Sequence, residues 1–239
     1  MENIKPAGNI ARRGRYYLFV GSIAVLGGAI AMALGILSLV LPLSTQIIIQ
    51  AFFALMVLGG FIFAAVGIAA IVRALTLQKD NPLAYAVGEA LTQFLDNRYT
   101  YMRNVSKRRV GYIDAVLVGP PGALVFRIVD YEGVWMNERA EWINQRRGKL
   151  RNAKTNPTRE CAEDVYALRK FLSRRDLEQV PVHGIVVFTA RKIELSADGP
   201  VVPVCEISTL YQIMRRDYLV DERIAPPTVR AAVDAVYDG

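Results

Sequence analysis

Two charged residues interrupt segments that otherwise have the composition of buried β-strands. Asp114 lies within residues 112–118 and Arg127 lies within residues 123–129, and the other residues of both segments are uncharged. A carboxylate in a buried strand must be paired with a cation, hydrated or bound to a metal ion. Asp114 is therefore the first candidate for chemistry in this chain, and its surroundings decide which chemistry that is.

Other sites that would point to a specific reaction are missing from the sequence. Cys161 and Cys205 stand in apolar surroundings without CxxC spacing, and the chain has one His. This excludes an ordinary Cys/His zinc site and a disulfide framework, and favours two core thiols in a reducing compartment. Neither GxGxxG nor GxxxxGK[ST] occurs, so Rossmann or P-loop nucleotide binding is not supported.

Residues 139–159 hold seven bases against one acid, Glu141. The candidates for contacts with phosphate groups are Arg146, Arg147, Lys149, Arg151 and Lys154, with Arg139 and Arg159 at the ends of the run. The phosphates belong to anionic lipid headgroups or to nucleic acid, and a solvated loop is the alternative. A shorter basic cluster consists of Arg103, Lys107, Arg108 and Arg109.

Two long apolar segments precede these residues. Residues 16–72 contain no Asp, Glu, Lys, Arg or His, and residues 17–41 and 47–72 are each long enough to cross a bilayer as a helix. A signal peptide would have a shorter apolar core. The sequence predicts an integral membrane protein with a two-helix hairpin. No ionisable group lies inside either span, which argues against a transporter.

The positive-inside rule gives the orientation of this hairpin. The bases flank it on both outer sides and are absent from the turn at residues 42–46; they are Lys5, Arg12, Arg13, Arg15, Arg73 and Lys79. Both termini are therefore expected in the cytoplasm of a bacterial-type plasma membrane. Small residues repeat at Gly27, Ala31 and Gly35 and at Gly60 and Ala64; packing within the hairpin is favoured over a homo-oligomer.

The remaining segments predict a soluble α/β domain with a mixed sheet. Asn-Pro pairs start helices at residues 82–97 and 157–173, and a Gly-Pro-Pro-Gly turn joins the strands at 112–118 and 123–129. Further strands are expected near residue 134 and at 183–190 and 201–205, and helices at 208–215 and 227–237. We therefore predict that the chain is divided into a basic tail (1–15), the hairpin (16–73), a linker (74–81), the domain (82–216) and a tail with a helix (217–239).

Several of these segments, taken in order, resemble a nuclease-related (NERD) domain over about residues 82–215. They are Gly88-Glu89, the run from Tyr112 to Pro120, the Phe126 strand with Tyr131-Glu132-Gly133, Asn156-Pro157, and Ile185-Val186-Val187-Phe188-Thr189. The resemblance implies a restriction-endonuclease-like fold. In active PD-(D/E)xK enzymes of this kind, an Asp and a Glu bind Mg²⁺ and a Lys two residues after the Glu helps to activate water.

The residues that this resemblance assigns to the site are only partly retained. Glu89 and Asp114 match the pattern, whereas its Glu-x-Lys falls on Arg127 and Val129, and a frequent Gln on Glu160. Arg127 would repel Mg²⁺, so we expect a degenerate site without bound metal or cofactor, in a domain that binds or scaffolds at the membrane. The alternative is a tethered Mg²⁺-dependent endonuclease in which Asp130, Glu132, Glu138 or Lys149 complete the site.

The turn also predicts a register. If it is centred between Pro120 and Pro121, Val118 opposes Ala123 and Asp114 opposes Arg127. Directly opposed residues have Cβ atoms about 4.5–5.5 Å apart. We therefore expect an Asp114–Arg127 ion pair in place of the metal ion.

Overall fold

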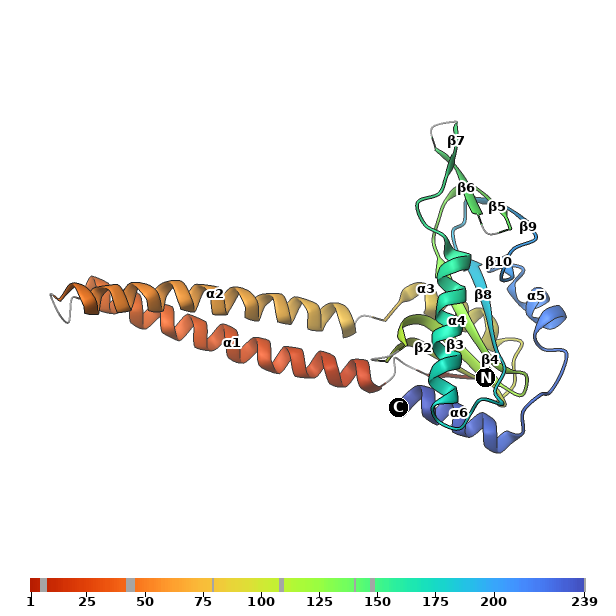
Figure 1. Cartoon of the computed structure of the whole chain (residues 1–239), viewed down its shortest axis with the longest axis horizontal. Helices are drawn as coiled ribbons and strands as arrows, with labels where there is room; N and C mark the ends of the chain where they lie inside the picture. The colour runs from red at the N-terminus through yellow and green to blue at the C-terminus, as the bar shows by residue number, and fades with distance from the viewer. Residues whose placement is uncertain are drawn as a thin grey trace. The chain divides into compact units, whose positions relative to one another are not determined.

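The computed structural model describes residues 1–239 except 5–7, 42–45, 79, 108–109, 140, 147–148 and 239, and only the backbone of 8–13, 76–78, 146 and 238. The chain forms two compact units (Figure 1). One consists of Ile10–Lys79, and the other combines Met1–Asn9 with Asp80–Gly239. The predicted turn at 42–46 falls almost wholly outside the described residues, as do Lys5, Lys79 and the side chains of Arg12 and Arg13.

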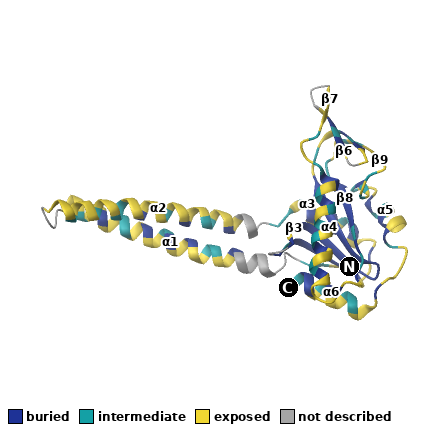
Figure 2. Ribbon diagram, in the orientation of Figure 1, coloured by how far each residue is buried: buried dark blue, intermediate teal, exposed yellow. Residues whose placement is uncertain are grey.

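The first unit is a helical hairpin made of α1 (Gly8–Val40) and α2 (Ile47–Gln78). Within them, Gly14–Val40 and Ile47–Leu75 are long and apolar enough to span a membrane. Most residues of the two helices are exposed (Figure 2), and many of them are large and apolar, such as Leu26 and Leu55, which are both 65% exposed. Large apolar surfaces of this kind need a bilayer or a partner to cover them.

The two helices of the hairpin meet at small residues. A Cβ atom added at Gly28 would lie 2.5 Å from the carbonyl oxygen of Gly60, so only glycine permits this approach. Packing of the small residues within the hairpin is thus confirmed for Gly35 and Gly60. The prediction was wrong for Gly27, where an added Cβ would meet no atom within 4 Å.

The second unit is built on a mixed sheet with the strand order β1-β2-β3-β4-β8-β10. Its strands are β1 (Glu2–Ile4), β2 (Thr100–Lys107), β3 (Gly111–Gly119), β4 (Gly122–Val129), β8 (Val182–Phe188) and β10 (Val204–Glu206). The hairpin β3–β4 has the predicted register, with Val118 opposite Ala123 and Gly119 opposite Gly122. The parallel pairing of β4 with β8 and the antiparallel pairing of β3 with β4 confirm a mixed α/β fold.

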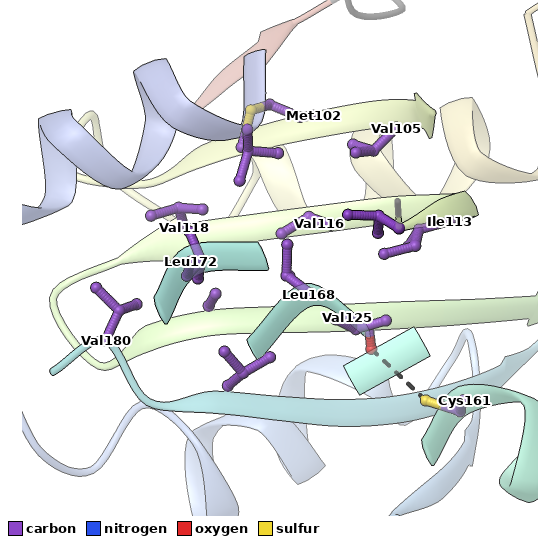
Figure 3. Close-up of a cluster of buried hydrophobic side chains, with 14 of the residues drawn as sticks. Met102, Val105, Ile113, Val116, Val118, Val125, Cys161, Leu168, Leu172 and Val180 are labelled. Atoms are coloured by element: carbon purple, nitrogen blue, oxygen red, sulfur yellow. Dashed lines mark hydrogen bonds between the residues drawn. The ribbon is translucent and has the colours of Figure 1, made fainter. Parts of the chain in front are cut away.

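Helices cover both faces of this sheet. The helices are α3 (Pro82–Thr92), α4 (Pro157–Ser173), α5 (Leu210–Asp217) and α6 (Pro226–Asp238). Side chains of α4 and α6 pack in one core cluster with Val116 and Val125, and those of α3 and α5 pack in another with Leu117 and Phe126. Figure 3 shows Leu168 and Leu172 of α4 in the first cluster. Alternation along β3 and β4 thus sends successive side chains to opposite layers.

A smaller sheet with the order β7-β6-β5-β9 adjoins the first. It is made of β5 (Gly133–Glu138), β6 (Glu141–Arg146), β7 (Lys149–Asn152) and β9 (Ile193–Asp198). Trp135 and Trp142 from this sheet pack against Phe188 of β8, with ring centroids 6.2 and 5.5 Å away. The aromatic contacts join the two sheets in one core.

Both ends of the chain belong to the domain, unlike the tails that the sequence predicted. Residues Glu2–Ile4 form an edge strand parallel to β2, and α6 packs against β2 and β3 through the buried Ala232 and Val236. The predicted division into a basic tail at 1–15 and a C-terminal tail at 217–239 is therefore wrong for these segments. The apolar residues of these two segments gain a core position only because the sheet provides a surface for them to pack on.

Candidate functional site

Asp114 lies where the pairing of β3 with its neighbours is interrupted. β2 pairs with β3 at Ala115 and at Ile113 but not at Asp114, and β4 pairs with β3 only from Ala115 onward. The facing Asn104 of β2 has a positive φ of 49°. The side chain of Asp114 is 6% exposed and can replace ladder bonds that the backbone does not make.

The carboxylate of Asp114 accepts two hydrogen bonds from other elements. The backbone N–H of Ile128 donates to Oδ2 at 2.9 Å, and the side-chain amide of Asn81 lies 3.4 Å from Oδ1. Burial raises the pKa of Asp114, and the Ile128 N–H and the charge of Arg127 oppose that rise. Asn81 caps α3 by accepting from the backbone N–H of Leu83, so Asp114 connects β4 to the start of this helix.

Arg127 forms its ion pairs with α4. Its guanidinium group is paired with Glu160, and its Nη1 lies 4.0 Å from Oδ2 of Asp164. The predicted ion pair with Asp114 is therefore wrong for this structure, although the register that suggested it is right. Arg127 belongs to the face of the sheet that α4 covers, and Glu160 and Asp164 line the adjacent face of that helix.

Asp164 is a site residue that sequence reasoning missed. It lies one turn after Glu160 on α4, and i,i+4 spacing on a helix placed under β4 is the signal that could have identified it. Burial first, and then the charges of Asp114 and Glu160, raise the pKa of Asp164 to about 6, although Arg127 opposes the shift. Burial alone would lower the pKa of Arg127, but the three carboxylates together raise it.

Val129 and Glu89 are the other two positions that the NERD resemblance assigns to the site. Both lie apart from the charged residues around Arg127. Val129 is 5% exposed in the apolar cluster with Trp135 and Phe188, where a lysine ammonium group would be buried without a partner. Glu89 is on the exposed side of α3, and its Oε1 lies 3.4 Å from the amide of Asn3 on β1. Within the described residues, no hydrogen bond or ion pair joins Glu89 directly to Asp114.

Under the endonuclease alternative, acids from nearby positions would complete the site. In the structure these acids lie away from Asp114. Asp130 follows β4, and its Oδ1 lies 3.4 Å from the hydroxyl of Thr189. Glu132 is exposed in the segment between β4 and β5, and Glu138 ends β5 in the smaller sheet. Across the part of the chain that the structure describes, no three His, Cys, Asp or Glu side chains are grouped to hold a metal ion.

A polar network surrounds the start of α3 and includes the strand β1. Arg103 of β2 is 3% exposed and bonds to Oδ2 of Asp80 at 3.1 Å and to Oδ1 of Asn3 at 3.0 Å. Its guanidinium carbon also lies 5.0 Å from the ring centroid of Tyr85. Arg103 thus holds together the segment that precedes the helical hairpin and the segment that follows it. It is not part of a basic surface cluster, and neither is the buried Lys107; Arg108 and Arg109 lie outside the described residues.

The basic residues of the run at 139–159 lie on several different elements of the structure. Lys149 and Arg151 are exposed on β7, and the exposed Lys154 follows it. Arg139 lies in the turn between β5 and β6, at the other end of β6, and Arg159 of α4 pairs with Glu163 at 3.0 Å. Arg147 and the side chain of Arg146 lie outside the described residues. The part that remains together is an ordered β-hairpin, not a loop.

A family model matches the part of the chain that contains these residues. The family model for the nuclease-related domain (NERD) matches residues 79–189, from the start of α3 to the end of β8. Searches of curated proteins and of solved structures gave no significant match. With Asp114 and Arg127 on the paired strands β3 and β4 at its centre, residues 79–189 of this chain form a nuclease-related domain.

Proposed function

We propose that this chain is a two-pass membrane protein whose nuclease-related domain does not cleave nucleic acid and acts as a binding or scaffolding module at the cytoplasmic face. The observation that carries the proposal is the pairing of Arg127 with Glu160 on α4. A guanidinium group held beside Asp114 supplies the positive charge that a divalent cation would otherwise bring. The hydrogen bonds to the two oxygens of Asp114 also satisfy part of its acceptor capacity without a metal ion.

Asp114 and Glu89 have structural partners in this arrangement. Asp114 bonds to Asn81, and Glu89 lies beside Asn3. Asn3 and Asn81 belong to the chain segments on either side of the helical hairpin. The two retained carboxylates therefore support the attachment of the hairpin to the domain, which gives a reason for their presence without catalysis.

The membrane topology is supported by the strand β1. Glu2–Ile4 pairs with β2, which comes after the hairpin in the chain, so the segments before and after the hairpin fold into one domain. Two segments of one folded domain must lie on the same side of a bilayer, and the chain between them therefore crosses it an even number of times. The flanking bases then favour the cytoplasmic side.

A nuclease assay tests the absence of catalysis. The full-length protein in detergent is expected to cut plasmid DNA with Mg²⁺ or Mn²⁺ no faster than its Asp114→Ala variant. A reporter after Gly239 should be cytoplasmic, and one inserted at Ser44 should be external. Cleavage that EDTA and Asp114→Ala both abolish would refute the proposal, as would external reporters at the C-terminus.

A tethered metal-dependent endonuclease remains a second candidate because of Asp164. Its Oδ2 is buried and has no hydrogen-bond partner among the described residues, and its charge interacts with those of Asp114 and Glu160, although these three carboxylates would have to move closer together to hold a metal ion. Metal binding would require Arg127 to leave the group. This function predicts cleavage that is lost in Asp164→Asn as well as in Asp114→Asn.

A further inference from the structure

The hairpin formed by β6 and β7 projects a concentrated positive charge. Residues 143–154 contain five bases and no acid. β7 is the edge strand of the smaller sheet and pairs only with β6, and all four of its residues are exposed (Figure 2). Two of these cations, Lys149 and Arg151, are therefore carried by an exposed edge strand and are available to a partner.

An exposed aliphatic side chain lies in the middle of this charge. Leu150 is 59% exposed between Lys149 and Arg151. The register places Leu150 opposite Gln145, and Arg151 opposite Asn144, so Leu150 and the two cations point to opposite faces of the hairpin. Long basic side chains on an edge strand can bend toward a polar surface while a neighbouring apolar side chain enters a less polar layer.

This combination fits a bilayer surface better than a nucleic acid. A leucine gains free energy by leaving water for the acyl boundary, whereas a phosphodiester backbone offers it no such environment. Single-stranded nucleic acids are usually held by exposed aromatic side chains that stack on bases. In the smaller sheet the aromatic residues that the structure describes, Trp135 and Trp142, are instead buried in the core.

The connections between the helical hairpin and the domain are short. β1 ends at Ile4 and α1 begins at Gly8, and α2 ends at Gln78 and α3 begins at Pro82. If the helical hairpin crosses the membrane, as proposed above, the domain is attached to the bilayer through two short segments. Weak contacts then suffice for docking because the domain is already concentrated at the surface.

From these observations we infer that the β6–β7 hairpin is a docking element for anionic lipid headgroups, with Lys149 and Arg151 contacting phosphate and Leu150 entering the acyl boundary. This inference rests on the proposed membrane anchoring but not on the absence of catalysis. Each base near an anionic surface shifts the equilibrium between docked and undocked states by about fivefold. Docking must also weaken as salt screens the charges.

The test uses the full-length chain in nanodiscs. The variant Gln145→Cys, next to Leu150, carries an environment-sensitive fluorophore; Cys161 and Cys205 are 0% and 2% exposed, so they are not expected to react. We expect blue-shifted emission and quenching by lipid-borne spin labels in phosphatidylcholine discs that contain phosphatidylglycerol. A label at Val220→Cys, on an exposed residue outside the hairpin, is the control and should not respond.

Two variants and a comparison of lipid compositions decide the outcome. Lys149→Glu with Arg151→Glu should abolish the response, and Leu150→Ser should leave a salt-sensitive response with less quenching by deep spin labels. The intrinsic fluorescence of Trp135 and Trp142 verifies that each variant is folded. An equal response in discs of phosphatidylcholine alone, or no response in anionic discs, would overturn the inference.

A response to added oligonucleotide but not to anionic lipid would assign the hairpin to nucleic acid instead, and would also overturn it. Both leaflets of a nanodisc are accessible, so the result does not depend on orientation in the cell. A negative result here is therefore distinguishable from a failure of the topology or cleavage tests.

Discussion

Arg127 on β4 is paired with Glu160 on α4, while Asp114 on the neighbouring strand accepts a hydrogen bond from the backbone N–H of Ile128 at 2.9 Å. The cation therefore links the sheet to the helix above it, and the carboxylate links two strands and the start of α3. Both groups satisfy their charge through neighbours that belong to different elements. The predictions below separate these structural roles from catalytic ones.

The first prediction concerns the stability that Arg127 supplies. Arg127→Ala leaves Asp114, Glu160 and Asp164 without their common cation, and because the pair is partly exposed we expect a cost of about 1–3 kcal/mol. Urea unfolding of the domain can be followed by fluorescence because both tryptophans, Trp135 and Trp142, lie within it. The matched control is Arg159→Ala on the exposed side of α4, expected within about 0.5 kcal/mol of the parent. Equal effects of the two substitutions would contradict the assigned role.

The second prediction concerns metal binding. Arg127→Glu places a fourth carboxylate beside Asp114, Glu160 and Asp164, so mutual repulsion should lower the melting temperature and Mn²⁺ should restore it. The parent protein should show no such stabilisation by Mn²⁺. The additional change Val129→Lys should destabilise the protein because it buries an ammonium group among Trp135 and Phe188. Stabilisation of the parent by Mn²⁺, lost in Asp114→Asn, would be evidence for an existing metal site.

The third prediction is a pH dependence that arises from Asp164, whose pKa is raised to about 6. A carboxyl group with a raised pKa binds its proton more tightly in the folded state, so folding stability rises as the pH falls through that pKa. Between about pH 7 and pH 5 the parent should gain about 1 kcal/mol relative to Asp164→Asn. Glu163→Gln, the exposed neighbour on α4, is the control and should keep the gain. A gain of the same size in Asp164→Asn would show that another group titrates.

The fourth prediction concerns the attachment of the hairpin to the domain. Arg103→Ala removes the bonds to Asp80 and Asn3, and since the Arg103 side chain is 4% exposed we expect a loss of about 2–3 kcal/mol. Hydrogen exchange should become faster at Glu2–Ile4 and at the first turn of α3. Arg98→Ala, which removes ion pairs of a side chain that is 58% exposed, is the control and should cost at most about 1 kcal/mol. Unchanged exchange at β1 in Arg103→Ala would contradict a role in attachment.

Several features of this protein were determined by its sequence because they depend on neighbours along the chain. The length of the two apolar runs led to α1 and α2, the Asn-Pro pairs led to the starts of α3 and α4, and the Gly-Pro-Pro-Gly turn led to the register of β3 with β4. Apolar run length, helix capping and tight-turn geometry are local properties, so a short window of residues contains the information.

The tertiary structure decided the features that depend on residues far apart. Three residues at the start of the chain carry no strong strand signal, and Glu2–Ile4 becomes a strand only because the edge of β2 is free to pair with it. The sequence did not predict β6 and β7 because their many charged and polar residues show no alternation of apolar and polar types. The alternation of buried and exposed side chains appears only in the structure, where Trp142 and Asn144 are buried. Arg127 has three acidic neighbours, Asp114 on the adjacent strand and Glu160 and Asp164 on the helix that covers the sheet. Which of them it pairs with was set by the placement of α4, because an ion pair forms where packing brings opposite charges together and not where strand register alone allows it.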